Sequence, residues 1–209
     1  MSMSIERVNI TSEHNLEGML RLKSKKAGVV ICHPHPLYGG NMYNNVVSAI
    51  EDGYSAQGFS TLIFNFRGVG NSEGEYDEGE GEVKDALAAY RHLAKHLDDD
   101  AKLTLAGYSF GAWVISRSAL EIEQFDSLFL VSFPCLIYKY EHLKNFHKEI
   151  IIVGGTYDDI APMDDLYELY QHLPTKDKHL KVINTTHFYA GKETELIDFI
   201  KETIPKVTH

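Results

Sequence analysis

The chain has 209 residues, 44% of them hydrophobic, and a formal net charge of −10. This length and composition fit one globular domain over residues 1–209 and exclude a fibrous or disordered chain. The acidic excess disfavours a nucleic-acid partner, whose phosphates would be repelled, and no apolar run approaches the ~20 residues of a membrane-spanning helix.

The cysteines and the N-terminal segment indicate the compartment. Cys32 and Cys135 form no CxxC pair and lie in apolar surroundings, so we expect buried free thiols. The first ten residues lack the basic and apolar regions of a signal peptide. We therefore expect a cytoplasmic protein with no membrane partner.

Strand and helix patterns alternate along the chain. Segments 5–10 and 16–22 predict an N-terminal β-hairpin, because apolar and polar residues alternate on both sides of a turn-prone stretch. Short apolar runs then predict strands, and apolar residues at helical spacing predict the helices between them. The expected strands are 28–32, 61–66, 102–106, 127–131, 149–153 and 179–183, and the expected helices are 43–57, 81–97, 110–120, 163–173 and 193–204.

This alternation predicts an α/β fold of three layers. We expect a mostly parallel, eight-stranded sheet with helices on both faces. The irregular segment 132–147 leaves no room for a large cap domain. In such sheets, functional residues gather in the loops after the carboxyl ends of the strands.

One such loop carries a motif for nucleophilic catalysis. The strand at 102–106 runs into Gly107-Tyr108-Ser109-Phe110-Gly111 and then into a helix. In this setting G-x-S-x-G is a nucleophile elbow, whose sharp turn requires small residues on both sides of the serine. We predict Ser109 as the nucleophile and the Phe110 N–H as a donor to a developing oxyanion.

A serine nucleophile needs a base and a carboxylate that orients it. In the chain order Ser, Asp, His, both partners should follow later strands. Asp158 follows the strand at 149–153, and His187 follows the strand at 179–183. Asp159 is the alternative acid, with helix capping as its structural role.

Four segments resemble the alpha/beta-hydrolase superfamily over nearly the whole chain. They read HPHPLYGGNM, NFRGVGNSEGE, GYSFG, and GTYDDIAP with THF. They look like small bacterial hydrolases with an HPHP loop, with dienelactone hydrolases and short-chain carboxylesterases as more distant relatives. The resemblance places the acid three residues after Gly155, at Asp158. Serine at the elbow, where dienelactone hydrolases have cysteine, implies ordinary ester or amide chemistry.

The HPHP loop departs from this family in its second oxyanion donor. The family's loop often reads His-Gly-x, and the N–H after the glycine donates. Here Pro34 and Pro36 cannot donate. His35, Leu37 and Tyr38 remain, and we predict Leu37.

Two further groups have alternative interpretations. His33 and His35 form a His-x-His pair that could bind a metal, but no third ligand is placed nearby, so loop anchoring is the better interpretation. Arg67 is expected to hold its glycine-rich loop, with binding of a substrate carboxylate as the alternative. We expect neither a metal nor a cofactor.

Together these residues predict a serine hydrolase that cleaves small acyl esters through Ser109, His187 and Asp158. Thioesterase or peptidase and amidase activity on the same triad is the alternative, and a non-catalytic binding protein of this fold is a further one. An exposed final strand or helix could pair two chains into a homodimer. We expect an open cleft lined by Leu37, Tyr38, Tyr108, Phe133, Leu136 and Tyr138, with Tyr38, Tyr108 and Phe133 contacting a small-molecule acyl substrate.

Overall fold

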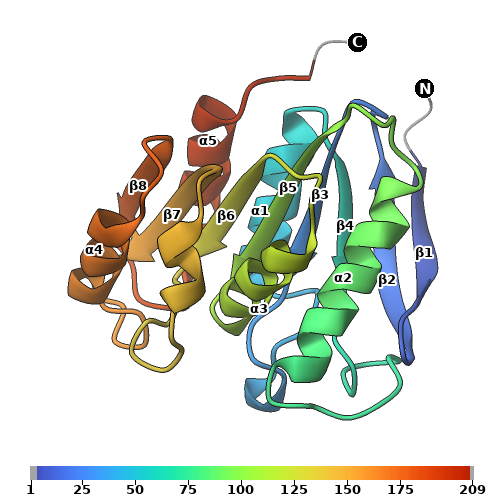
Figure 1. Ribbon diagram of the computed structural model, residues 1–209, viewed down its shortest axis with the longest axis horizontal. Coiled ribbons are helices and arrows are strands. Elements are labelled where there is room, and N and C mark those ends of the chain that lie inside the picture. The colour runs from blue at the N-terminus through green and yellow to red at the C-terminus, as the bar shows by residue number, and fades with distance from the viewer. Residues whose placement is uncertain (1–3, 208–209) are drawn as a thin grey trace.

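The computed structural model describes residues 4–207, whose eight strands form one sheet (Figure 1). The strand order is β1-β2-β4-β3-β5-β6-β7-β8. β2 runs antiparallel to β1 and β4, and every other pairing is parallel, which confirms the predicted fold class. The strands are β1 (Ser4–Thr11), β2 (Asn15–Leu22), β3 (Ala27–Cys32), β4 (Ser60–Phe64), β5 (Lys102–Tyr108), β6 (Ser127–Val131), β7 (Glu149–Gly155) and β8 (Lys178–Ile183).

Helices cover both faces of the sheet (Figure 1). The α-helices are α1 (Asn45–Ala56), α2 (Glu80–Ala94), α3 (Phe110–Ser118), α4 (Met163–His172) and α5 (Glu193–Thr203). Three short 3₁₀ helices are η1 (Pro36–Tyr38), η2 (Ala119–Glu121) and η3 (Glu141–Asn145). The core residues of α2, α3 and α4 belong to one hydrophobic cluster, and those of α1 and α5 belong to another on the opposite face.

The central strand β3 shows why the sequence forms three layers. All six of its residues are buried. Val30 and Cys32 contribute to the cluster with α2 and α3, whereas Val29 and Ile31 contribute to the cluster with α1 and α5. Because side chains alternate along a strand, a strand covered on both faces must be apolar at every position.

Some element ends differ from the expected ones for local reasons. β4 ends at Phe64, because the Phe66 N–H leaves the sheet and donates to the ring of His33. α1 begins after Asn44, whose side chain accepts from the Val46 N–H and caps the helix.

The loops that follow the parallel strands gather at one end of the sheet, at the lower edge in Figure 1. The connection from β6 to β7 contains only η3 and no further domain, as expected. Among the helices within residues 4–207, none combines the length and the apolar character needed to cross a membrane.

Candidate active site

Ser109 stands between β5 and α3 in a strained backbone conformation. Its φ is 55° and its ψ is −122°, a region that non-glycine residues rarely occupy. A Cβ atom on Gly107 would lie 2.3 Å from the carbonyl oxygen of Gly111, and one on Gly111 would lie 2.4 Å from that of Cys32. Both glycines are therefore required by backbone contacts, as the elbow motif predicts.

Ser109, His187 and Asp158 come together in one hydrogen-bonded row. His187 Nε2 lies 3.0 Å from Ser109 Oγ, and His187 Nδ1 lies 2.8 Å from Asp158 Oδ2 and 2.9 Å from Oδ1. All three residues are buried. Asp159, the alternative acid, is exposed to solvent.

The carboxylate of Asp158 is held in its charged form. Its Oδ1 accepts from the backbone N–H groups of Ile160 and Ala161, at 3.0 and 2.8 Å. Burial by itself raises the pKa of Asp158, but the hydrogen bonds from His187 and Ala161 outweigh it and lower the pKa below its usual value. A charged acid can orient His187 and stabilise the imidazolium form.

Tyr108 supports His187 from the other side. Its hydroxyl donates to the backbone carbonyl of His187 at 2.7 Å, and the two rings lie 5.3 Å apart. The predicted substrate contact Tyr108 thus lines the site and also fixes the His187 loop.

The structure contradicts the prediction of Leu37 as the second oxyanion donor. The Leu37 N–H donates to His35 Nδ1 at 3.2 Å, and the Tyr38 N–H donates to the carbonyl of His35 at 3.1 Å. Both bonds close the η1 turn. The His35 N–H has no acceptor within residues 4–207, and Phe110 begins α3, so its N–H has no partner within that helix. The N–H groups of His35 and Phe110 are therefore free to donate to a bound group, whereas that of Leu37 is not.

Beside Ser109 lies a cavity of about 630 Å³. Tyr38 and Tyr138 line it as predicted, but Phe133 does not. Phe133 is fully buried, because its side chain packs into the hydrophobic cluster shared by α2, α3 and α4. Leu37 and Leu136 are exposed to solvent and do not line the cavity. Its lining residues are Pro34, His35, Tyr38, Gly39, Gly40, Asn44, Tyr108, Ser109, Phe110, Pro134, Ile137, Tyr138, Ile160, His187 and Phe188.

Several apolar lining residues were not predicted, and three of them have large side chains. Ile137, Ile160 and Phe188 line the cavity from the loops after β6, β7 and β8. Phe188 directly follows His187, so its position in the sequence could have indicated it. Ile137 and Ile160 gave no comparable signal.

The histidines of the HPHP loop anchor that loop. His33 is fully buried; its Nδ1–H donates to the carbonyl of Pro34 and its Nε2 accepts from Phe66 N–H. His35 accepts from Leu37 and lies 3.2 Å from the hydroxyl of Tyr76 through Nε2. A metal ion would need a free lone pair on a ring nitrogen of each histidine. The ring nitrogens of His33 and His35 already form these hydrogen bonds.

Arg67 also has a structural role. Its guanidinium donates twice to Asp85, at 2.8 and 3.0 Å, and it contacts Glu13 at 3.3 Å. Its side chain is only 4% exposed and does not line the cavity. The alternative role in binding a substrate carboxylate therefore has no support from this geometry.

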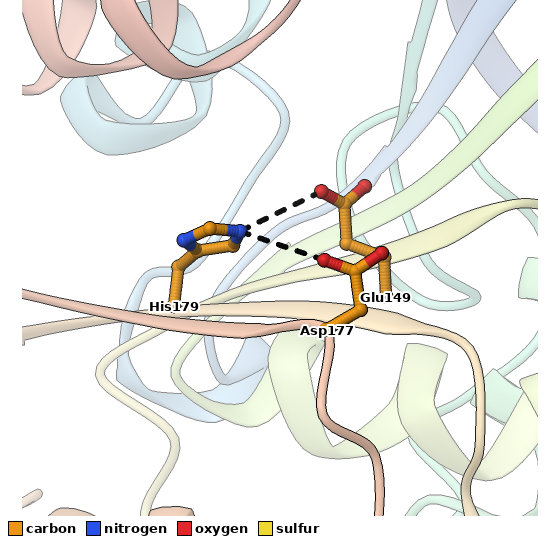
Figure 2. Close-up of side chains that lie close together, drawn as sticks. All are labelled: Glu149, Asp177 and His179. Atoms are coloured by element: carbon orange, nitrogen blue, oxygen red, sulfur yellow. Dashed lines mark ion pairs between the residues drawn. The ribbon is translucent and has the colours of Figure 1, made fainter.

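Figure 2 shows a group of potential metal ligands away from this site. Glu149, at the start of β7, and Asp177 lie 3.9 and 3.7 Å from His179 Nε2, at the start of β8. Because Ser109 and its partners follow the opposite ends of the parallel strands, this group does not contact them. The side chains of Glu149, His179 and Asp177 are 35%, 50% and 69% exposed.

The chain was compared with family models, with curated proteins and with solved structures. No family model matches the chain, but individual proteins and solved structures do. A solved structure of an alpha-beta serine hydrolase homologue from Coxiella burnetii is 32% identical, covers 95% of this chain and 97% of its own, and superposes with a TM-score of 0.86. The uncharacterized protein RP471 of Rickettsia prowazekii is 34% identical over 83% of this chain and 76% of its own length.

A mitochondrial palmitoyl-protein thioesterase, ABHD10 of Bos taurus, is 32% identical over 48% of this chain and 31% of its own length. This match covers only part of either protein. The likeness to the Coxiella structure extends over the full length of both chains. The eight-stranded sheet and the serine elbow indicate the same fold. The chain therefore belongs to the alpha/beta-hydrolase superfamily, as a hydrolase without a large cap domain.

Proposed function

We propose that the protein is a serine hydrolase that cleaves small, uncharged acyl esters through an acyl-enzyme. The observation that carries the proposal is the row from Ser109 Oγ through His187 to Asp158, with distances of 3.0 and 2.8 Å, at a largely apolar cavity. A hydroxyl, a base and an oriented carboxylate in this geometry suit nucleophilic attack on an acyl carbonyl.

In this mechanism Ser109 Oγ bonds to the carbonyl carbon while His187 Nε2 takes the hydroxyl proton. The oxyanion accepts hydrogen bonds from the N–H groups of Phe110 and His35. The carbon–oxygen bond to the alcohol breaks, and His187 returns the proton to the leaving alkoxide. Water, deprotonated by His187, then attacks the acyl-enzyme, releasing the carboxylic acid and restoring Ser109.

The cavity supports an uncharged acyl group. No Lys, Arg, Asp or Glu is among its lining residues in the described chain. Its volume of about 630 Å³ lies in the range of sites that hold drug-sized ligands. A substrate carboxylate would therefore lose its hydration without gaining a cationic partner.

The test is turnover of p-nitrophenyl acetate, butyrate and hexanoate by wild type and Ser109→Ala, with Ser118→Ala as a control that removes a buried hydroxyl elsewhere. We expect Ser109→Ala to abolish turnover and labelling by a fluorophosphonate, and Ser118→Ala to keep both. Equal turnover by wild type and Ser109→Ala would refute the proposal.

Thioester cleavage is the second candidate. The local likeness to the palmitoyl-protein thioesterase ABHD10 favours it, and the same three residues would carry it. Matched butyryl esters of p-nitrophenol and p-nitrothiophenol decide between the two. The ratio of kcat/KM for the thioester to kcat/KM for the oxygen ester is compared with the ratio of their uncatalysed hydrolysis rates. A larger ratio for the enzyme would favour a thioesterase.

A further inference from the structure

The two residues whose N–H groups are free near Ser109 touch each other through their side chains. The centroid of the His35 ring lies 4.8 Å from that of the Phe110 ring. Their loops are also close in the backbone, because a Cβ atom on Gly111 would lie 2.5 Å from the carbonyl oxygen of His33. The loop after β3 and the elbow after β5 therefore pack on each other, and each supplies one of the proposed oxyanion donors.

Both ring nitrogens of His35 have a partner, and the partners determine where its proton lies. Nδ1 accepts from the Leu37 N–H at 3.2 Å, so Nδ1 carries no proton. Burial lowers the pKa of His35, which favours the neutral ring. The ring proton is then on Nε2, which lies 3.2 Å from the hydroxyl oxygen of Tyr76. Nε2 therefore donates, and the Tyr76 hydroxyl accepts.

Tyr76 contacts both donor residues from a third loop. Its ring centroid lies 5.0 Å from that of His35 and 6.0 Å from that of Phe110. It belongs to the connection between β4 and α2 and is not one of the residues that line the cavity. Tyr76 can therefore act on a bound substrate only through His35 and Phe110.

The segment that carries Tyr76 is held on both sides. Before it, Glu73 forms two hydrogen bonds with the first residue of β2, of 2.9 and 3.0 Å. After it, the N–H groups of Asp77 and Gly79 donate to the buried carboxylate of Glu82, at 3.0 and 2.8 Å. These bonds give the Tyr76 ring a fixed place beside the HPHP loop.

We propose that Tyr76 is a positioning residue for the two oxyanion donors. Its hydroxyl holds the ring of His35 and its own ring packs against Phe110, so it fixes the spacing of their N–H groups. This inference rests on the proposed function, in which these groups hold the oxyanion. Donors that are held in place stabilise the charge that develops in the transition state more than they bind the neutral ester. The Tyr76 hydroxyl therefore contributes to kcat and not to KM.

The experiment compares two test variants with a matched control. Tyr76→Phe removes the hydroxyl and keeps the ring. His35→Asn keeps a side-chain oxygen that can accept from the Leu37 N–H and cap η1, but it has no atom in the place of Nε2. Tyr170→Phe is the control, because the Tyr170 hydroxyl also forms a hydrogen bond of 3.2 Å, to the carbonyl of Lys178 at the start of β8.

Two measurements are made on each variant, with urea unfolding to follow stability. The first is kcat and KM for p-nitrophenyl butyrate. The second is the inhibition constant of an alkyl trifluoromethyl ketone. Its carbonyl carbon bonds to Ser109 Oγ, its oxygen becomes an oxyanion, and His187 takes the serine proton. Because this adduct has no leaving group, its affinity reports on the oxyanion donors without the later steps.

We expect Tyr76→Phe to lower kcat about 5-fold, to leave KM nearly unchanged and to raise the inhibition constant by the same factor, as for one neutral hydrogen bond. His35→Asn should lose at least as much, although it keeps the cap of η1. The double variant Tyr76→Phe/His35→Asn should be no worse than His35→Asn alone, because the bond is already lost. Tyr170→Phe should keep the wild-type constants.

Wild-type kcat and inhibition constant in Tyr76→Phe would overturn the positioning role, as would a loss of stability with both constants unchanged. Fully additive losses in the double variant would also overturn it. Ser109→Ala separates this failure from failure of the proposed function. If Ser109→Ala abolishes turnover and Tyr76→Phe behaves as wild type, only the positioning role is wrong. If Ser109→Ala keeps full turnover, both are wrong.

Discussion

The hydroxyl of Tyr108 donates to the backbone carbonyl of His187 at 2.7 Å, so the residue before the proposed nucleophile holds the proposed base. Tyr108→Phe removes this bond and keeps the ring. We expect kcat to fall by about 5-fold with an unchanged KM, because one neutral hydrogen bond contributes about 1 kcal/mol. Tyr90→Phe is the matched control, since the Tyr90 hydroxyl also donates to a backbone carbonyl, that of Gln124. Equal losses in the two variants would contradict the role of Tyr108.

The His35 N–H is tested by a pair of substitutions at one position. The φ of His35 is −54°, which proline can adopt, so His35→Pro removes the N–H without requiring a new backbone angle. His35→Ala removes the ring and keeps the N–H. We expect kcat of His35→Pro to lie about 10²-fold or more below that of His35→Ala, the usual loss for one oxyanion donor. Similar kcat values for both variants would assign the second donor elsewhere.

Gly111→Ala should destabilise the whole protein. Its Cβ atom would lie 2.4 Å from the carbonyl oxygen of Cys32, a backbone atom that cannot move alone. We expect a loss of about 3 kcal/mol in the free energy of unfolding, the upper range for overpacking. Gly191→Ala is the control, because a Cβ there meets nothing within 4 Å and only the φ of 73° is unfavourable. That variant should lose about 1–2 kcal/mol in urea unfolding.

The buried His33 should make stability depend on pH. Burial lowers its pKa from 6.5 to about 4. Between these values the unfolded chain binds a proton at His33 and the folded protein does not, so stability falls as the pH decreases from about 6.5 to 4. The free energy of unfolding falls by about 3 kcal/mol over this range. Above pH 6.5 His33 is neutral in both states, so none of this loss occurs.

Urea unfolding at pH 7.5 and 5.0 measures this dependence. His33→Gln should be less stable at pH 7.5 but should lose less stability on acidification than wild type. His172→Gln, at an exposed position, should keep the wild-type dependence. An unchanged dependence in His33→Gln would show that other groups cause it.

The sequence predicted those parts of the site that backbone constraints determine. The turn around Ser109 tolerates only small residues at Gly107 and Gly111, so this constraint is visible in the sequence. The continuous apolar run of β3 likewise indicates a strand covered on both faces. Asp158 and His187 could be placed because each lies in the loop that follows a strand, β7 and β8 respectively.

Contacts between distant residues could not be predicted in the same way. The assignment of Leu37 failed because its N–H partner, the ring of His35, depends on how η1 folds. The assignment of Phe133 failed because its side chain packs into the core instead of lining the cavity, and the path of the chain after β6 decides this. The contact between Tyr76 and His35 requires two loops to meet, which only the folded chain shows.

The position of β8 at the edge of the sheet has a consequence for how the protein would lose activity. Within residues 4–207, β8 pairs only with β7, and His187 lies in the loop that follows β8. The proposed nucleophile, by contrast, follows β5, which lies in the middle of the sheet between β3 and β6. Fraying of this outer strand would separate the base from Ser109 while the rest of the sheet stayed folded. Inactivation by heat or urea should therefore precede the loss of secondary structure.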